Sequence, residues 1–182
     1  MQNKSRLVVW ISLAALILSI LLAMQFQSFT DEVQSDEAVA YAVLFLAIGA
    51  IYELWQWLKA RNKMYRAAFG VGFFGLFFLG WVSGAVGIIG SENNPINLMY
   101  WAVPSVVFIG SSISLLRYRG MMYTLFAAAA VQALIPVIAL VISPEVSWGN
   151  AGVAGVFMVN GLFVALFAIS GLLFRRAQNK KN

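Results

Sequence analysis

The sequence contains no cysteine and no histidine. Without cysteine no disulfide framework can form. Haem ligation by His or Cys, a Cys/His zinc site and a histidine general base are excluded as well. The sequence also lacks a nucleophile–base pair, a pair of carboxylates at one depth and a glycine loop in the strand–turn–helix context that binds phosphate. We therefore expect a protein that is not an enzyme and that binds no cofactor and no metal.

Charged residues are also scarce. They make up 10% of the chain, against 62% hydrophobic residues, whereas a soluble domain carries about 25% charged residues. There is too little polar surface to cover a body exposed to water. Apolar runs of about 20 residues recur, and each is long enough to cross a bilayer core of about 30 Å.

These runs predict an all-α polytopic integral membrane protein with a six-helix transmembrane bundle made of three antiparallel hairpins. The predicted spans cover residues 7–26, 38–58, 67–89, 95–116, 121–142 and 153–174. Helices are expected because backbone groups in lipid must be satisfied within the segment, and the short alternating strands of a barrel are absent. The first apolar run is longer than the about 7–15 residues of a signal peptide, so we expect it to be retained.

The sign of the charge sorts along the chain. All 12 Lys and Arg residues fall on one side of the six-span arrangement, and the opposite loops carry only acids. The positive-inside rule then places both termini in the cytoplasm of a cell bounded by this membrane. Because the basic residues are divided among four short segments, anionic lipid headgroups are the expected contact and nucleic acid is not. No linker divides the chain, so residues 1–182 are expected to form a single six-span domain.

The most polar stretch is "GIIGSENNPINLMYW", residues 87–101. Asn94 followed by Pro95 predicts a helix N-cap and a first helical position. Asn97 is placed to bond back toward that cap. The stretch is thus explained as an outer turn. The alternative is a hard-cation site made of oxygen ligands, for which a single carboxylate is a poor donor set. The residues of the outer turn that bear on both hypotheses are Ser91, Glu92, Asn93, Asn94 and Asn97.

This stretch carries a resemblance. The segments "VGIIGSENNPINLMY", residues 86–100, and "RGMMYTLFAAAAVQAL", residues 119–134, resemble a pattern found in uncharacterised small bacterial multi-pass membrane proteins, in which Asp often replaces Asn93 and Ala replaces Ile96. The resemblance covers residues 81–142. It implies a bacterial cytoplasmic (inner) membrane and a four-span core to which residues 1–66 add a two-span hairpin. It implies no activity and no site residue.

Small residues follow one face of the third span. Gly80, Gly84 and Gly87, with Ser83, form small-xxx-small ridges that allow close helix approach. We expect these glycines to pack against another helix of the same chain, and the alternative is a face that binds a second copy.

Polar groups also lie within the predicted spans, in the outer half of the bundle. They are Ser83, Ser105, Gln132 and Asn160, accompanied by Pro104 and Pro136, which each remove one helical hydrogen bond. They either join helices or line a polar pocket, and helix joining is the favoured hypothesis. Gln132 and Asn160 fall at similar depth on neighbouring spans, so we expect these two amides to approach each other.

Glu53 is the acid inside a predicted span. Intramembrane acids are candidates for proton or cation coupling. The alternative is pairing with Arg61, Arg117 or Arg119 at the inner interface.

The favoured function is that of an accessory or structural membrane protein whose partners are membrane lipids, another membrane protein or a second copy of the chain. The alternative is a small oligomeric transporter or channel with a polar pocket in the outer half of the bundle.

Overall fold

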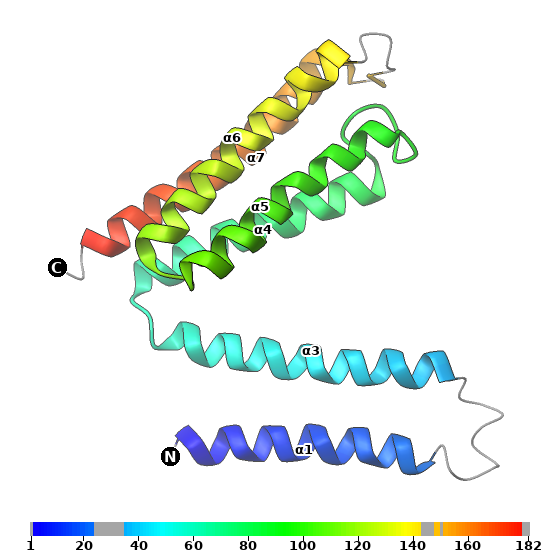
Figure 1. Cartoon of the computed structure of the whole chain (residues 1–182), viewed down its shortest axis with the longest axis vertical. Helices are drawn as coiled ribbons and strands as arrows, with labels where there is room; N and C mark the ends of the chain where they lie inside the picture. Colours follow the sequence, from blue (N-terminus) through cyan, green and yellow to red (C-terminus); the bar gives the residue numbers. More distant parts are fainter. Residues whose placement is uncertain (1, 24–34, 143–147, 150, 180–182) are drawn as a thin grey trace. The chain divides into compact units, whose positions relative to one another are not determined.

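A computed structural model of the protein describes residues 2–23, 35–142, 148–149 and 151–179 (Figure 1). Across these residues 88% are helical and none is in a strand, which confirms the all-α prediction. The acids at positions 31, 32 and 145 lie outside the described residues.

The chain divides into two compact units, Met1–Arg61 and Asn62–Asn182. The first, here called the hairpin unit, contains α1 (Gln2–Ala23) and α3 (Ser35–Lys59), which pack against each other. The second, the four-helix unit, contains α4 (Lys63–Ala85), the 3-10 helix η1 (Pro95–Trp101), α5 (Ala102–Ser114), α6 (Tyr118–Ile142) and α7 (Gly152–Asn179). That both units form one six-span domain stays a prediction.

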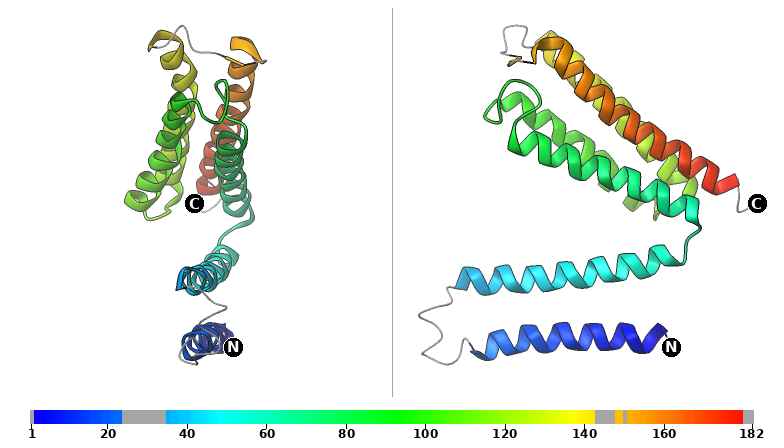
Figure 2. Two further views of the ribbon diagram at one scale, coloured as in Figure 1. Left: turned by 90° about the vertical axis from the view of Figure 1, so that its right-hand side faces the viewer. Right: turned by 180° about the vertical axis from the view of Figure 1, so that it is seen from behind.

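The helices of the four-helix unit pack in the order α4, α7, α6, α5 (Figure 2). Helix α7 packs against both α4 and α6, and α5 packs against α6. The helices at the two ends of this order, α4 and α5, do not pack closely against each other. The side of the unit between α4 and α5 is therefore the side on which a cavity can form.

Among the described residues, four helical segments are long and apolar enough to cross a membrane. They are Lys63–Ala85, Pro95–Ser114, Tyr118–Ile142 and Gly152–Asn179, all in the four-helix unit. Arg6–Ser19 is a shorter apolar helix. The length and composition of the last four predicted spans are thus confirmed, and the crossing of a membrane by residues 7–26 and 38–58 stays a prediction.

One end of the four-helix unit is held together by Tyr65. The side chain is fully buried, its hydroxyl donates to the carbonyl of Leu116 at 2.8 Å, and its ring meets those of Tyr118 and Phe174 edge-on with centroids 4.9 Å apart. The start of α4, the turn between α5 and α6, and the end of α7 therefore meet here. We call this the basic end, because Lys63, Arg66, Arg117, Arg119, Arg175 and Arg176 all lie on these segments.

Asn62 supplies a second connection at the basic end. Its side-chain oxygen accepts from the N–H of Tyr65 at 2.7 Å and caps α4, while its amide nitrogen donates to the carbonyl of Ala177 at 3.2 Å. A single side chain thus satisfies a free donor at the start of α4 and a free acceptor near the end of α7.

Several helix boundaries differ from the sequence prediction by a few residues. Helix α4 ends at Ala85, four residues before the predicted end at residue 89. Residues 95–101 form the 3-10 helix η1 and α5 begins at Ala102, but the two are continuous, so Pro104 lies inside the helical segment Pro95–Ser114 as predicted. Pro136 lies inside α6, also as predicted.

Candidate functional site

A chain of hydrogen bonds joins three buried polar side chains in the four-helix unit. The Nε2 group of Gln132 on α6 donates to Oδ1 of Asn160 on α7 at 2.8 Å. The Nδ2 group of Asn160 donates to the hydroxyl of Tyr100 on η1 at 2.9 Å and to the carbonyl of Val156 at 2.8 Å. Each of the three side chains is at most 2% exposed. The predicted approach of Gln132 and Asn160 is therefore confirmed, and Tyr100 is a partner that the sequence did not indicate.

The carbonyl oxygen of Gln132, Oε1, is buried and has no hydrogen-bond partner among the described residues. The neighbouring bonds fix this arrangement. Asn160 must turn its nitrogen toward the Val156 carbonyl, so its oxygen faces Gln132 and must receive a donor. The amide nitrogen of Gln132 is committed to that bond, and Oε1 is left on the other side. The Tyr100 hydroxyl accepts from Asn160, which leaves its own proton available to donate.

The other two members of the expected polar pocket lie elsewhere. Ser105 is exposed, and its hydroxyl donates to the carbonyl of Trp101 one turn back in its own helix at 2.8 Å. Ser83 is half-buried and lines a different cavity at the end of α4. The four residues do not converge, so Gln132 and Asn160 join helices in this unit rather than line a pocket with Ser83 and Ser105.

The outer turn is organised around Asn97, which is 6% exposed. Its oxygen accepts from the N–H groups of Ile88 and Ile89 at 3.1 and 2.9 Å, and its nitrogen donates to the carbonyls of Ile89 and Ser91 at 3.1 and 2.7 Å. The sequence predicted that Asn97 bonds back toward the cap at Asn94. Instead its side chain pairs with backbone N–H and carbonyl groups of the residues that follow α4, because the turn folds back over η1.

Asn94 caps η1 as predicted. Its oxygen accepts from the N–H of Ile96 at 3.2 Å, with Pro95 at the first helical position, and its nitrogen donates to the carbonyl of Ile89 at 3.1 Å. The amide oxygens of Asn94 and Asn97 are thus committed to backbone donors. Among the described residues no group of three or more Asp, Glu, His or Cys side chains could hold a metal ion. The turn itself is accounted for without a cation.

A cavity of about 550 Å³, here called the outer pocket, lies between the end of α4, the outer turn and the start of α5. Its lining residues are Leu76, Leu79, Gly80, Ser83, Gly84, Glu92, Asn93, Asn94, Pro95, Asn97, Leu98, Tyr100, Trp101 and Pro104. This size falls within the range of about 300–1,000 Å³ that is typical of small-molecule sites. The pocket brings together Gly80, Ser83 and Gly84 of the small-residue ridge and four residues of the outer turn, Glu92, Asn93, Asn94 and Asn97.

Gly80 and Gly84 are the open floor of this pocket. A Cβ atom built on either would find no heavy atom of a neighbouring element within 4 Å, and both residues are exposed. Within the four-helix unit these two glycines therefore do not pack against another helix, and packing against a helix outside this unit stays a prediction. Gly87 does not pack against a helix either. It lies after α4 with φ +72°, and a Cβ there would come within 2.4 Å of the Ser91 backbone.

The close packing of α4 uses other glycines. A Cβ on Gly72 would lie 2.8 Å from Oγ of Ser170, and one on Gly75 would lie 3.1 Å from the Phe167 ring, both on α7. The hydroxyl of Ser170 donates to the carbonyl of Ala68 at 2.6 Å across the same contact. Ala68, Gly72 and Gly75 share a helix face by spacing, which is the signal that the sequence analysis missed.

The outer pocket has an apolar interior and a polar mouth. Leu76, Leu79 and Leu98 supply apolar surface. Glu92 and Asn93 are exposed on the outer turn, and neither makes a hydrogen bond with a described residue. Such a combination suits an amphiphilic occupant better than a fully polar one.

Glu53 belongs to the hairpin unit, where its carboxylate forms an ion pair with Arg6. The Nε group of Arg6 donates to it at 3.1 Å, and Nε1 of Trp10 donates at 2.9 Å. The sequence analysis named Arg61, Arg117 and Arg119 as alternative partners, whereas the partner within this unit is Arg6 on α1. The pair joins α1 to α3, and this structural role accounts for the acid.

Comparison of the chain with protein-family models, with curated proteins and with solved structures gives no match. The resemblance of residues 86–100 and 119–134 to small bacterial membrane proteins therefore stays a prediction.

Proposed function

We propose that this protein is a non-enzymatic accessory protein of the bacterial cytoplasmic membrane, and that it binds a second membrane component in the outer pocket. The component is a lipid or a segment of another membrane protein. In this proposal all six predicted spans cross the membrane and both termini are cytoplasmic.

The observation that carries the proposal is the open glycine floor. Exposed small residues at Gly80 and Gly84 let a helix or an acyl chain approach the α4 backbone closely, where dispersion contacts are strongest. Among the described residues of the four-helix unit nothing occupies this position. The pocket above it faces the side between α4 and α5, which are not a closely packed pair.

The chemistry of the pocket supports binding rather than catalysis. Its ionisable lining residues are Glu92 and Tyr100. A nucleophile paired with a general base is missing from this set, which favours a binding role. The orientation is supported by the basic residues on the segments joined by Tyr65, since positive residues favour the cytoplasmic side.

A photo-crosslinking experiment tests the proposal. Leu98 lines the pocket and is 67% exposed, so a photoreactive phenylalanine can replace it without entering the core. Irradiation of native membranes should yield one discrete adduct with a lipid or a protein. Gly84→Leu should abolish this adduct by filling the floor. The matched control is Gly70→Leu, because Gly70 is also an open glycine on α4 but does not line the pocket.

The comparison of Gly84→Leu with its control Gly70→Leu decides the outcome. Loss of the adduct with Gly84→Leu and its retention with Gly70→Leu support the outer pocket as the binding site. An adduct that survives Gly84→Leu, or that disappears equally with Gly70→Leu, refutes it.

A transporter remains the second candidate because of Tyr100. Its hydroxyl belongs to the buried chain with Asn160 and Gln132, and the same residue lines the outer pocket. A substrate that contacts Tyr100 in the pocket is therefore connected to Gln132 through this chain of hydrogen bonds. Flux of a panel of radiolabelled solutes into liposomes that contain the protein tests this: flux abolished by Gln132→Leu supports transport, and no flux above empty liposomes refutes it.

A further inference from the structure

The last turns of α7 present two different faces. Ser170, Phe174 and Ala177 are fully buried against the neighbouring helices. The other face carries Ile169 and Leu172, which are 48% and 47% exposed, followed by the exposed Arg175 and Arg176. An apolar surface thus leads directly to a pair of cations at the basic end of the helix.

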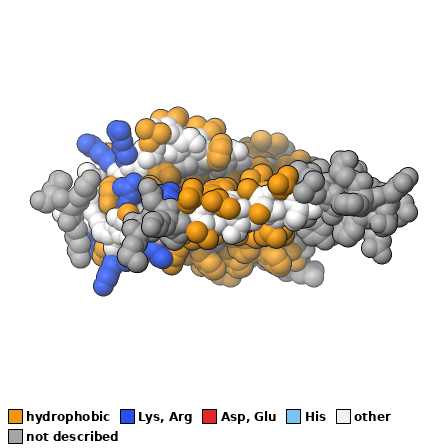
Figure 3. Space-filling view, turned by 90° about the horizontal axis from the view of Figure 1, so that it is seen from below, with side chains coloured by type: hydrophobic (Ala, Val, Ile, Leu, Met, Phe, Trp, Pro, Cys, Tyr) orange, Lys and Arg blue, Asp and Glu red, His pale blue; other side chains and the backbone are white. Residues whose placement is uncertain are grey.

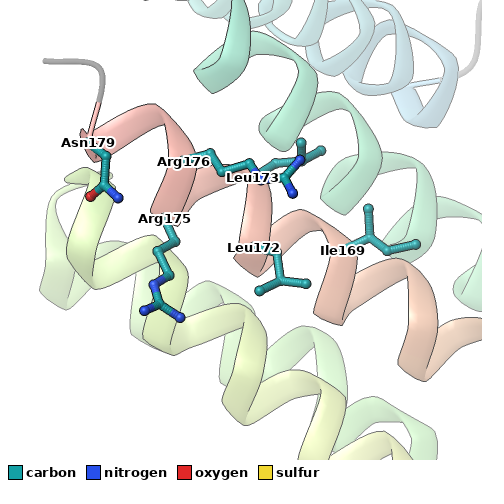
Figure 4. Close-up of a pocket in the computed structure, with 6 residues that line it drawn as sticks. All are labelled: Ile169, Leu172, Leu173, Arg175, Arg176 and Asn179. Atoms are coloured by element: carbon teal, nitrogen blue, oxygen red, sulfur yellow. The ribbon is translucent and has the colours of Figure 1, made fainter.

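The side chains of this face border an open space of about 500 Å³, here called the arginine pocket. It is lined by Ile169, Leu172, Leu173, Arg175, Arg176 and Asn179. Figure 4 shows all six side chains extending from the last turns of α7. The arginine pocket shares no lining residue with the outer pocket.

No described acid neutralises the two arginines. The ion pair found among the described residues joins Arg6 and Glu53 in the hairpin unit. In the described part of the four-helix unit the acid is Glu92, which lies beyond the opposite end of α4. Figure 3 shows one face of the protein, on which Lys and Arg side chains lie beside hydrophobic ones. The basic end therefore carries an uncompensated positive charge.

We propose that the arginine pocket binds one anionic glycerophospholipid of the adjacent leaflet. The guanidinium groups of Arg175 and Arg176 hold the phosphate, to which a guanidinium can donate two parallel hydrogen bonds. Leu172 and Ile169 support the first part of an acyl chain. From Ile169 to Arg176 the helix rises by about 10 Å, a length that fits a phosphate followed by the glycerol and the first methylene groups.

Charge selects the class of lipid. A zwitterionic lipid brings an ammonium group next to its phosphate, and that cation would meet the excess of positive charge at the basic end. A lipid with an anionic phosphodiester and no ammonium group avoids this repulsion. The pocket is therefore specific for phosphatidylglycerol-like headgroups over phosphatidylethanolamine-like ones.

The test is a lipid titration of the purified full chain in detergent, followed by native mass spectrometry. Phosphatidylglycerol is compared with phosphatidylethanolamine of the same acyl chains. The wild-type chain should bind one phosphatidylglycerol more tightly than additional copies. The double variant Arg175→Gln/Arg176→Gln should bind it about 30-fold more weakly, at about fivefold for each basic residue.

The matched control is Arg117→Gln/Arg119→Gln, which removes the same charge from exposed positions at the same end. It should change the affinity by less than about threefold, because salt screens charges outside the pocket. Leu172→Asn should weaken binding of the lipid. Inorganic phosphate should not compete with it, because it cannot use the apolar surface.

Three results would overturn the proposal: equal binding of the two lipids, an equal loss of affinity in both double variants, or full competition by inorganic phosphate. The thermal unfolding of each variant is measured in parallel, so that a loss of binding is counted only when the fold is retained. All four substituted arginines are exposed, and retention of the fold is the expected result.

Discussion

Nε2 of Gln132 lies 2.8 Å from Oδ1 of Asn160, and this bond connects α6 to α7 at the most closely packed helix pair of the chain. The two residues do not contribute equally. Asn160 uses both ends of its amide and bonds to Gln132, Tyr100 and Val156. Gln132 makes one bond and leaves its oxygen unpaired.

This asymmetry predicts the order of two substitutions. Asn160→Leu should lower the free energy of unfolding by about 2–3 kcal/mol, because it leaves polar atoms of Gln132 and Tyr100 buried without partners. Gln132→Leu should cost less than about 1 kcal/mol, because it leaves Oδ1 of Asn160 without a donor but removes the unpaired Oε1 at the same time. Unfolding in mixed micelles with increasing dodecyl sulfate measures both. Equal costs, or a greater cost for Gln132→Leu, would contradict the hydrogen-bond arrangement.

The two kinds of glycine on α4 should respond differently to a larger side chain. Gly72→Leu should destabilise the protein by about 1–3 kcal/mol, because a Cβ at Gly72 already lies 2.8 Å from Ser170. Gly84→Leu should leave thermal stability in detergent unchanged, since the space at Gly84 is open. Differential scanning fluorimetry of the two variants checks this. A large destabilisation by Gly84→Leu would show that another helix packs there.

Asn97 should be the most sensitive residue of the outer turn. Asn97→Ala removes four hydrogen bonds to the chain between Ile88 and Ser91. Backbone groups without partners each cost about 1–3 kcal/mol when buried, so we expect a loss of at least about 2 kcal/mol. Asn93→Ala, at an exposed position, is the control and should change the unfolding free energy by less than about 0.5 kcal/mol. Similar effects of both would argue against Asn97 as the organiser of the turn.

The absence of cysteine makes the proposed orientation easy to measure. A cysteine introduced at Asn93 or at Asn179, both exposed, is the one thiol in the chain. Asn93→Cys should react with a membrane-impermeant maleimide in intact spheroplasts. Asn179→Cys should react after the membrane is permeabilised. Labelling of Asn179→Cys in intact spheroplasts would reverse the proposed topology.

The sequence alone was sufficient for the helices of the four-helix unit. Apolar runs of the length that crosses a bilayer force the backbone to satisfy its own hydrogen bonds, so helix is the local solution whatever the neighbours are. The sequence also predicted the cap of η1, which begins with Asn94 and Pro95 as expected. The proximity of Gln132 and Asn160 also followed from the sequence, because a short connection makes α6 and α7 antiparallel neighbours and fixes the relative depth of the two amides.

The tertiary structure decided which faces of these helices meet. Ala68, Gly72 and Gly75 form one small-residue face of α4, and Gly80 with Gly84 forms another; only the first packs against α7. Lipid tails are as apolar as the helices, so no hydrophobic gradient along the sequence selects between two such faces. The choice depends on the rotation of α4 against α7, which is set by the bond from Ser170 to Ala68 and the packing of Phe167 on Gly75. The same rotation opens Gly80 and Gly84 to the outer pocket.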